Sequence, residues 1–219
     1  MKRRIIILAI LGTMAYSQLT AQEELGSKTV NPWSISCDIY SRYVWRGTDF
    51  GNSPSIQPSI TYSSGALTVG VWGAWQFNGS ANENDVFISY QVGPLALTLT
   101  DYFFPSHSGE SDYIFNTNSI DGPHFLELSL STSIKALTIT SGYFFLEPGA
   151  TTQSFYSNLS CGPFHIGLGN GMYTTVDKDG SDVFGVVDIG ITATNGLYSC
   201  SWVLNPNQQT TFLTVGKSF

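Results

Sequence analysis

Six ionisable side chains stand in stretches where about every second residue is apolar, and they are the first candidates for chemistry. Such an alternation places them on one face of a β-strand and the apolar residues on the other. On the inner face of a closed sheet, charges either pair with one another or form a ring that selects ions. Both interpretations stay open for the predicted lumen residues, which are Asp38, Arg42, Arg46, Asp85, Glu127 and Asp188.

The histidines lack the partners, by spacing, that a catalytic site requires. A hydrolase on the outer wall of a barrel needs His and Ser close together, but His165 alternates with glycines and His124 follows a long loop. His107 lies in that loop with Glu110 and Asp112, a loose resemblance to the acid–His site of loop proteases. We therefore expect no catalytic residue and no enzyme activity.

Metal and cofactor chemistry is not expected either. Residues 177–182, Asp-Lys-Asp-Gly-Ser-Asp, resemble half of a calcium loop but lack its bidentate Glu, so they are interpreted as an acidic turn that binds divalent ions weakly. The cysteines Cys37, Cys161 and Cys200 are odd in number and are predicted to be small apolar side chains rather than disulfide or metal partners.

Strand-like segments with a period of two must position these side chains. We predict an all-β fold, a closed antiparallel transmembrane β-barrel of about twelve strands, an even number as in single-chain bacterial barrels. Further strands are expected around Asp85, Leu95, Leu126 and Leu137. The segments with predicted bounds are 34–46, 54–62, 66–75, 154–161, 164–173, 183–192, 198–204 and 210–219.

The segment from Thr210 to Phe219 alternates in the same way and stops on an aromatic residue. It resembles the closing strand of bacterial outer-membrane barrels, whose terminal aromatic is read by the insertion machinery. The resemblance implies that this strand pairs with the one beginning at Ser34 and that Phe219 lies near the periplasmic rim. The last strand of a secreted β-sandwich is the alternative.

The beginning of the chain predicts export. Residues 1–4 are basic after Met1 and residues 5–11 are apolar, so residues 1–21 are predicted to be a cleaved signal peptide and residues 22–219 the barrel. Cleavage after Ser17 or after Ala21 fits equally well. The predicted localisation is the cell outer membrane, with outer-membrane lipid as a partner.

The net charge of the mature chain argues against nucleic acid as a partner. Without residues 1–21, six Lys and Arg stand against 16 Asp and Glu, a net charge of −10. Such an acidic chain is not expected to bind nucleic acid. The low charged fraction, 11%, together with 22 Gly and 14% aromatic residues suits strands that water wets on one side only.

Linker lengths and aromatic residues orient the predicted barrel. Short linkers alternate with long polar ones, and short turns face the periplasm in bacterial barrels. Val187 and Met172 are predicted to point outward, and the side chains expected to face lipid include Ile35, Ile60, Val69, Ile88, Leu128 and Ile189. An aromatic girdle is predicted beside the long loops, formed by Tyr43, Trp45, Trp72, Trp75, Tyr102, Phe103, Phe104, Tyr143, Phe144 and Phe145.

Motifs in the first half of the mature chain carry a family resemblance. Ser41-Arg-Tyr-Val-Trp-Arg-Gly47 is followed by a short polar loop and Ser53-Pro-Ser-Ile-Gln57, and then by Val69-Gly-Val-Trp-Gly73, Asn84-Asp-Val-Phe87 and Asp101-Tyr-Phe-Phe-Pro105. These motifs resemble those of outer-membrane porins of the TorF type. The resemblance implies a small outer-membrane barrel that acts as a channel, in a family whose solutes are largely unassigned.

We expect a narrow channel for passive diffusion of small polar or cationic solutes, because twelve strands enclose little more than side chains fill. A closed-lumen structural or surface-interaction barrel is the alternative, and a barrel enzyme is the third hypothesis. Loop 105–123 is expected to fold over or into the mouth, or else to lie free on the surface. Its candidate constriction residues are Glu110, Asp112, Tyr113, Phe115 and Asp121.

Overall fold

The computed structural model describes residues 31–80, 82–105, 114–175 and 182–219. The predicted signal peptide therefore lies outside the described residues, as do His107, Glu110, Asp112 and Tyr113. Most of the acidic turn at 177–182 is also outside them. In the described part of the chain, no helix has the length and apolar character needed to cross a membrane.

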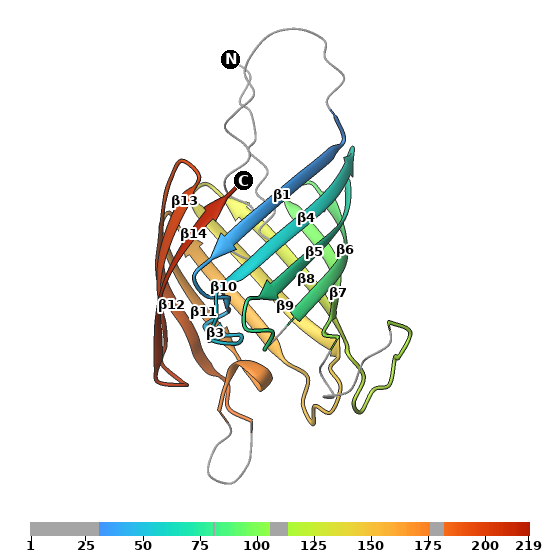
Figure 1. Ribbon diagram of the computed structural model, residues 1–219, viewed down its shortest axis with the longest axis vertical. Helices are drawn as coiled ribbons and strands as arrows, with labels where there is room; N and C mark the ends of the chain where they lie inside the picture. Colours follow the sequence, from blue (N-terminus) through green and yellow to red (C-terminus); the bar gives the residue numbers. More distant parts are fainter. Residues whose placement is uncertain (1–30, 81, 106–113, 176–181) are drawn as a thin grey trace, which may run out of the picture.

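Twelve strands form a closed barrel in which each strand pairs antiparallel with its neighbour in the chain (Figure 1). This confirms the predicted fold class and strand number. Two further strands, β2 and β3, pair only with each other and belong to the loop after β1. The barrel strands are β1 (Trp33–Tyr40), β4 (Ser55–Ser64), β5 (Leu67–Gln76), β6 (Asn82–Val92), β7 (Leu95–Phe103), β8 (His124–Ile134), β9 (Leu137–Leu146), β10 (Phe155–Cys161), β11 (Phe164–Gly169), β12 (Gly185–Asn195), β13 (Tyr198–Asn205) and β14 (Thr210–Ser218).

The first and last barrel strands close the sheet. Asp38 pairs with Ser218, Ile39 with Lys217 and Tyr40 with Gly216. The backbone N–H of Phe219 donates to the carbonyl of Cys37 at 3.0 Å, which extends the same ladder. The predicted pairing of the closing strand with the strand from Ser34 is therefore confirmed.

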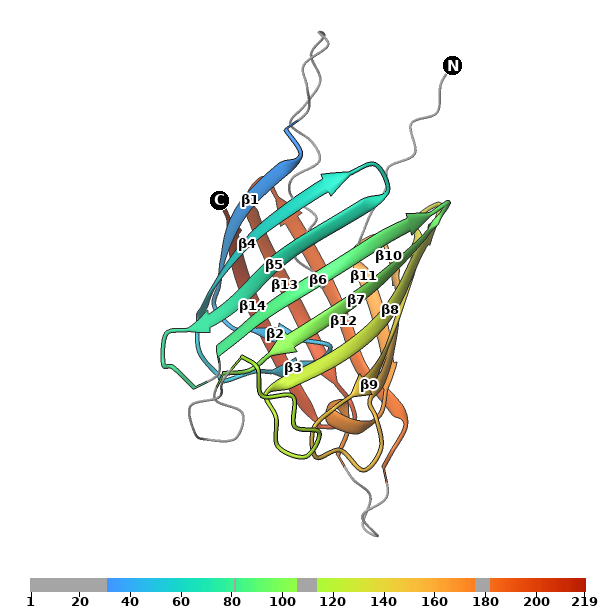
Figure 2. The same cartoon turned by 90° about the vertical axis from the view of Figure 1, so that its right-hand side faces the viewer.

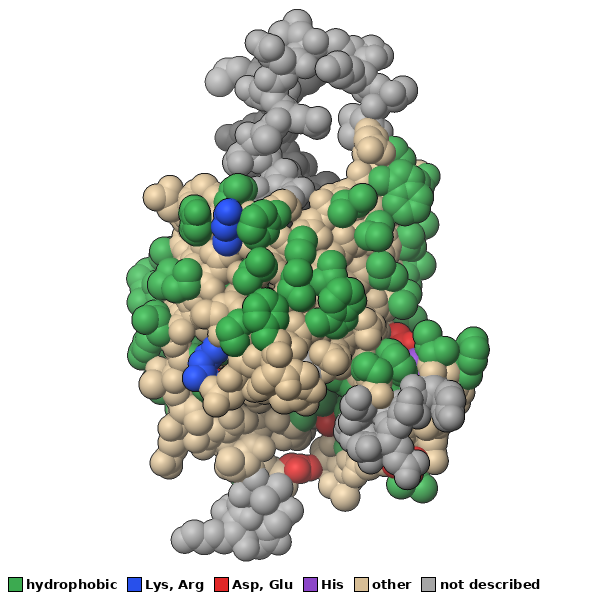
Figure 3. Space-filling view, viewed as in Figure 1, with side chains coloured by type: hydrophobic (Ala, Val, Ile, Leu, Met, Phe, Trp, Pro, Cys, Tyr) green, Lys and Arg blue, Asp and Glu red, His purple; other side chains and the backbone are tan. Residues whose placement is uncertain are grey.

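The two faces of the sheet differ in polarity, as the period of two predicts. Ile35 is 73% exposed on the outside, and Ile60, Ile88 and Leu128 are also exposed. Val69 and Ile189 are half-buried at the same outer positions. On the face seen in Figure 3, hydrophobic side chains spread over the barrel wall, while acidic ones lie toward the end with the long loops.

The two ends of the barrel also differ (Figures 1 and 2). Short turns join β4 to β5, β6 to β7, β8 to β9, β10 to β11 and β12 to β13 at one end, where β1 begins and β14 ends. A left-handed residue closes each of these turns, as tight hairpins require; these residues are Gly65, Gly93, Lys135, Gly162 and Gly196. The longer loops, including the 3-10 helix η2 (Gly171–Tyr173), lie at the other end.

Three predicted strand details are wrong. β1 ends at Tyr40 rather than continuing to Arg46. β11 ends at Gly169, so Met172 lies in η2, where it packs against buried aromatic residues instead of pointing outward. Val187 is fully buried rather than outward, because a β-bulge opposite Gly167 and Leu168 inserts it as an extra residue and changes the side to which it points.

Closure of the sheet can be tested by a disulfide across the seam. In a background with Cys37, Cys161 and Cys200 replaced by Ser, the pair Ile39→Cys and Lys217→Cys should oxidise to an intramolecular bond, because opposed residues of an antiparallel pair lie within disulfide reach. Non-reducing denaturing electrophoresis with mass spectrometry measures it. The matched pair Ile39→Cys and Leu213→Cys, out of register, should stay reduced; reduced thiols in both pairs would mean an open sheet.

Candidate functional site

Residues 41–54, between β1 and β4, fold into the barrel at the end with the long loops (Figure 2). We call this segment the plug. Its tip is a hairpin of β2 (Val44–Trp45) and β3 (Thr48–Asp49) with a two-residue turn between them. Both turn residues have positive φ, 50° at Arg46 and 79° at Gly47, which is the geometry of a type I′ hairpin turn. A non-glycine residue in this region stores strain that its surroundings must hold.

Gly47 presses against the opposite wall. A Cβ at this position would lie 1.9 Å from the backbone oxygen of Val187 on β12. The side-chain amide of Asn205 on β13 donates to the Gly47 carbonyl at 3.3 Å. Only glycine fits both the φ angle and the space, so the tip of the plug is fixed against β12 and β13.

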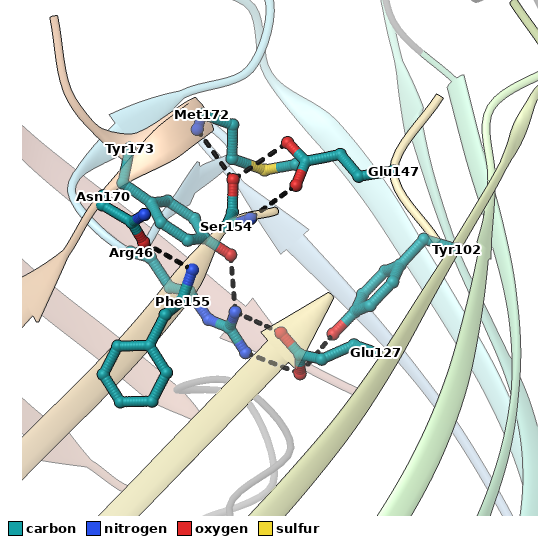
Figure 4. A network of polar contacts seen from close by, with 9 residues as sticks. All are labelled: Arg46, Tyr102, Glu127, Glu147, Ser154, Phe155, Asn170, Met172 and Tyr173. Carbon is teal, nitrogen blue, oxygen red and sulfur yellow. Dashed lines mark hydrogen bonds and ion pairs between the residues drawn. The ribbon is translucent and has the colours of Figure 1, made fainter. Parts of the chain in front are cut away.

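Arg46 extends from this turn to the centre of the barrel (Figure 4). Its guanidinium forms a bidentate ion pair with Glu127 of β8, in which Nη2 donates to Oε1 at 2.9 Å. It also donates to the hydroxyl oxygen of Tyr173 at 2.6 Å, and the Tyr102 hydroxyl donates to Glu127 at 3.3 Å. The Glu127 side chain is 2% exposed and that of Arg46 10%, so this pair is shielded from water.

Aromatic rings surround the Arg46 guanidinium. Its central carbon lies 4.2 Å from the ring centroid of Trp45, 4.7 Å from that of Tyr156 and 5.5 Å from that of Tyr173. Cation–π attraction therefore adds to the ion pair in a site with little water. The rings belong to a buried cluster whose members are Tyr102, Phe125, Phe144, Tyr156, Tyr173 and Val187.

The other half of the plug rests against β5 and β6. The rings of Tyr43 and Trp72 are 5.7 Å apart, and the Tyr43 hydroxyl hydrogen-bonds Glu83. A Cβ on Gly51 would lie 1.7 Å from the side-chain oxygen of Gln76, so this backbone approaches the wall closely. The plug thus spans the interior from β5 and β6 to β12 and β13.

The loop between β13 and β14 supports the plug directly, and the loop between β9 and β10 supports η2 beside it. Gln208 donates to the Thr48 hydroxyl at 3.3 Å and to the Tyr173 carbonyl at 3.2 Å. Glu147 accepts hydrogen bonds from the backbone and hydroxyl of Ser154 at 2.7 and 2.9 Å. Burial raises the pKa of Glu147, and the two bonds from Ser154 oppose that rise. Ser154 in turn accepts a bond from the backbone of Met172 at 2.8 Å.

The predicted lumen residues are not arranged as one ring. Besides Arg46 and Glu127, Arg42 pairs with Asp49 inside the plug. Asp188 accepts hydrogen bonds from Tyr156 at 3.0 Å and contacts His165 at 2.9 Å.

Two carboxylates lie elsewhere on the inner face. Asp38 is buried beside Ser218, to which it is hydrogen-bonded, and Asp85 is buried beside Glu83. The ion-pair interpretation therefore fits Arg42, Arg46, Glu127 and Asp188, while Asp38 and Asp85 stand apart from that group.

A cavity of about 600 Å³ extends from the plug toward the end with the short turns. Arg46, Trp45 and Tyr102 line one end of it, and turn residues such as Gly162 and Gly196 line the other. Its wall comes from β7 to β14 and β1 and combines Ser, Thr and Tyr hydroxyls and the Asn158 amide with apolar side chains. The interior is thus a cavity of mixed polarity with the plug as its floor.

The predicted aromatic girdle is only partly on the outside. Trp75, Tyr143 and Phe145 are exposed. Tyr43, Tyr102 and Phe144 are buried inside the barrel, and Trp45 packs beside them. The aromatic residues beside the long loops therefore form two sets. One set is exposed on the outer surface of the barrel, and the other forms the core around the plug.

The described part of loop 105–123 does not fill the mouth as expected. Phe115 is 91% exposed and Ile114 61%, and Asp121 is exposed as well. Phe115 therefore does not pack into the mouth, where the plug lies, and for this residue the alternative of a loop free on the surface fits. The other candidates, Glu110, Asp112 and Tyr113, lie outside the described residues.

Sequence reasoning missed the inner contacts of Tyr102, Tyr156 and Tyr173 with Arg46. One signal was present for the plug itself. The stretch after Arg46 holds Gly47, Gly51 and Pro54 within eight residues, a density of turn residues that argues against a continuous strand from Ser34 to Arg46.

The chain matches no protein-family model, and a search of curated proteins also finds no match.

The ion pair predicts a large coupling between Arg46 and Glu127. Glu127→Leu leaves a buried guanidinium without its partner and should lower the free energy of unfolding by about 3–5 kcal/mol. Arg46→Met with Glu127→Leu removes both charges and should cost much less. Urea unfolding followed by tryptophan fluorescence in detergent micelles measures the cycle, and equal losses in the single and double variants would contradict it.

Gly47→Ala tests the contact of the hairpin tip with β12. Gly65 is a matched control, because its φ of +60° resembles the +79° of Gly47 but nothing lies within 4 Å of its Cβ position. Gly65→Ala should cost about 1 kcal/mol from φ alone, and Gly47→Ala about 3 kcal/mol because the methyl group meets the Val187 backbone. The same unfolding assay applies, and equal costs would disprove close packing of the tip.

Proposed function

We propose that the protein is a narrow outer-membrane channel for small polar solutes, closed by its plug in the conformation described. The observation that carries this proposal is the cavity of about 600 Å³, lined in part by hydroxyl groups, between the plug and the short turns. A barrel that only has to be stable packs its interior with side chains, as small barrels do. Here the plug packs one end of the interior, and the rest encloses a cavity whose wall includes hydroxyl groups that water solvates.

The outer surface supports a membrane location. Large apolar side chains are exposed at alternate positions of successive strands, where a soluble protein would expose polar ones. In this proposal residues 1–21 direct export, Phe219 ends the strand that the insertion machinery reads, and the short turns face the periplasm. The cavity then opens toward the periplasm and the plug faces outward.

The plug has the features of a gate. It is held by polar and aromatic contacts around one ion pair, and its two strands have two residues each. Tyr40 and Ser55, which flank the plug, are directly paired, so the barrel wall is complete without it. A segment that the wall does not need is able to move without opening the sheet.

A closed-lumen barrel is the second candidate, favoured by the bidentate pairing of Arg46 with Glu127 and by the fit of Gly47 against β12. In that case the plug never moves and the outer loops carry the function. Conductance separates the two candidates.

Single-channel recording in planar bilayers tests the channel. Residues 42–53 are replaced by a four-residue turn containing Asn-Gly, which the pairing of Tyr40 with Ser55 permits. The wild-type protein should show intermittent openings and the variant a continuous, larger current. A plugless barrel without current would sink the proposal, and a wild type that never opens would favour the closed-lumen barrel.

The matched control for this experiment is an outer loop. Phe115–Thr117, of which Phe115 is 91% exposed, is replaced by Gly-Ser-Gly. Because this loop does not pack into the described interior, the current should equal that of the wild type. A large change in this control would assign gating to loop 105–123 instead of the plug.

A further inference from the structure

The cavity wall carries a recurring contact between an inward-facing glycine and an aromatic ring from the neighbouring strand. A Cβ on Gly216 would lie 2.2 Å from the ring of Tyr40, and a Cβ on Gly190 would lie 2.3 Å from the ring of His165. A Cβ on Gly167 would lie 2.5 Å from the hydroxyl of Tyr156. Each ring therefore lies across the backbone of a glycine rather than extending into the lumen.

These rings turn the wall into apolar platforms. Tyr40, Tyr156 and His165 all line the cavity. The hydroxyl of Tyr40 is tied to Ser199 by a hydrogen bond, and His165 is tied to Asp188 at 2.9 Å. Tyr40 and His165, each fixed at a polar atom and backed by glycine, present a ring face to the cavity at little further entropic cost. The ring of Tyr156 is covered instead by the Arg46 guanidinium, whose central carbon lies 4.7 Å from its centroid.

Hydroxyl and amide side chains line the cavity wall between the platforms. Each hydroxyl both donates and accepts, and each side-chain amide does the same with separate atoms. Cross-strand bonds such as Thr192 to Ser201, at 2.9 Å, use only part of this capacity. The hydroxyl and amide side chains of the cavity wall include Ser129, Thr140, Asn158, Ser160, Ser199 and Thr214.

The charged side chains that line the cavity all have polar partners. Arg42 is paired with Asp49, and Arg46 with Glu127. Asp188 has Tyr156 and His165 as partners. An ionic solute loses hydrating water when it enters the cavity, and only a free charge of opposite sign would offset that free-energy cost. The lining therefore suits a neutral solute with many hydroxyl groups and apolar C–H faces.

We infer that the cavity binds a neutral saccharide of one or two rings, with a pyranose face on Tyr40 and hydroxyls bonded to the Ser, Thr and Asn wall. The cavity volume of about 600 Å³ falls within the range of small-molecule sites. This inference deepens the proposed channel function by naming its solute class. It also differs from the sequence-based expectation of polar or cationic solutes, because the charged side chains of the lining already have partners.

Isothermal titration calorimetry of the purified full chain in detergent micelles tests the inference. The probes are glucose and maltose, with gluconate as an anionic and glucosamine as a cationic analogue. The neutral sugars should bind and the charged analogues should bind at least about tenfold more weakly. Equal binding of the charged analogues, or no binding of either neutral sugar, would overturn the inference.

Variants of the platform locate the site. Tyr40→Ala should weaken maltose binding about tenfold, and Tyr40→Phe, which keeps the ring, should retain most of it. Tyr143→Ala is the matched control, because Tyr143 is 48% exposed on the outer face and should bind maltose as the wild type does. Equal losses for Tyr40→Ala and Tyr143→Ala would overturn the placement in the cavity.

The binding assay is independent of conduction. Maltose binding in a protein that never conducts would support the saccharide site and reject the channel. Ion current through the plugless variant, together with no maltose binding by the full chain, would support the channel and reject the saccharide site.

Discussion

The pairing of Arg46 with Glu127 is the constraint on which the interior of this barrel depends. A guanidinium that has left water must find a carboxylate in good geometry, and Glu127 is the partner that β8 supplies. This requirement fixes the position of the hairpin tip. The same tip forms the floor of the cavity and the centre of the aromatic cluster, so one ion pair organises both halves of the interior.

Much of the barrel wall could be predicted because a strand exposes alternate residues to opposite surroundings. Ile35 and Asp38 are on opposite faces, as the alternation requires, and the ladder from Tyr40 to Gly216 closes the sheet. The alternation of short and long linkers predicted that the two ends of the barrel differ, because the length of a linker is also a local feature of the sequence. The alternation and the turn lengths depend on neighbours in the chain, which periodicity detects. The closing pair joins the two ends of the chain and is expected from the resemblance of the last strand to closing strands of outer-membrane barrels.

The plug could not be predicted from periodicity. Tyr43 and Trp45 alternate with Arg42 and Arg46 like a strand facing lipid, yet they form a hairpin that faces an apolar core inside the barrel. Periodicity does not tell an outer apolar surface from an inner one. The partner of Arg46 is 81 residues away, and the bulge that turns Val187 inward changes the register within β12.

The cavity lies to one side of the barrel interior, and this constrains any redesign of its lining. Among the described residues, those lining it come from the plug, from β7 to β14 and from β1, while the plug covers the inner faces of β5 and β6. Some of the lining strands also hold the plug, because the ring of Tyr156 on β10 lies against Arg46 and Asn205 of β13 bonds Gly47. Exchange of Ser and Thr residues on β9 to β14 therefore alters the lining and leaves the plug supported, provided that these contact positions are kept.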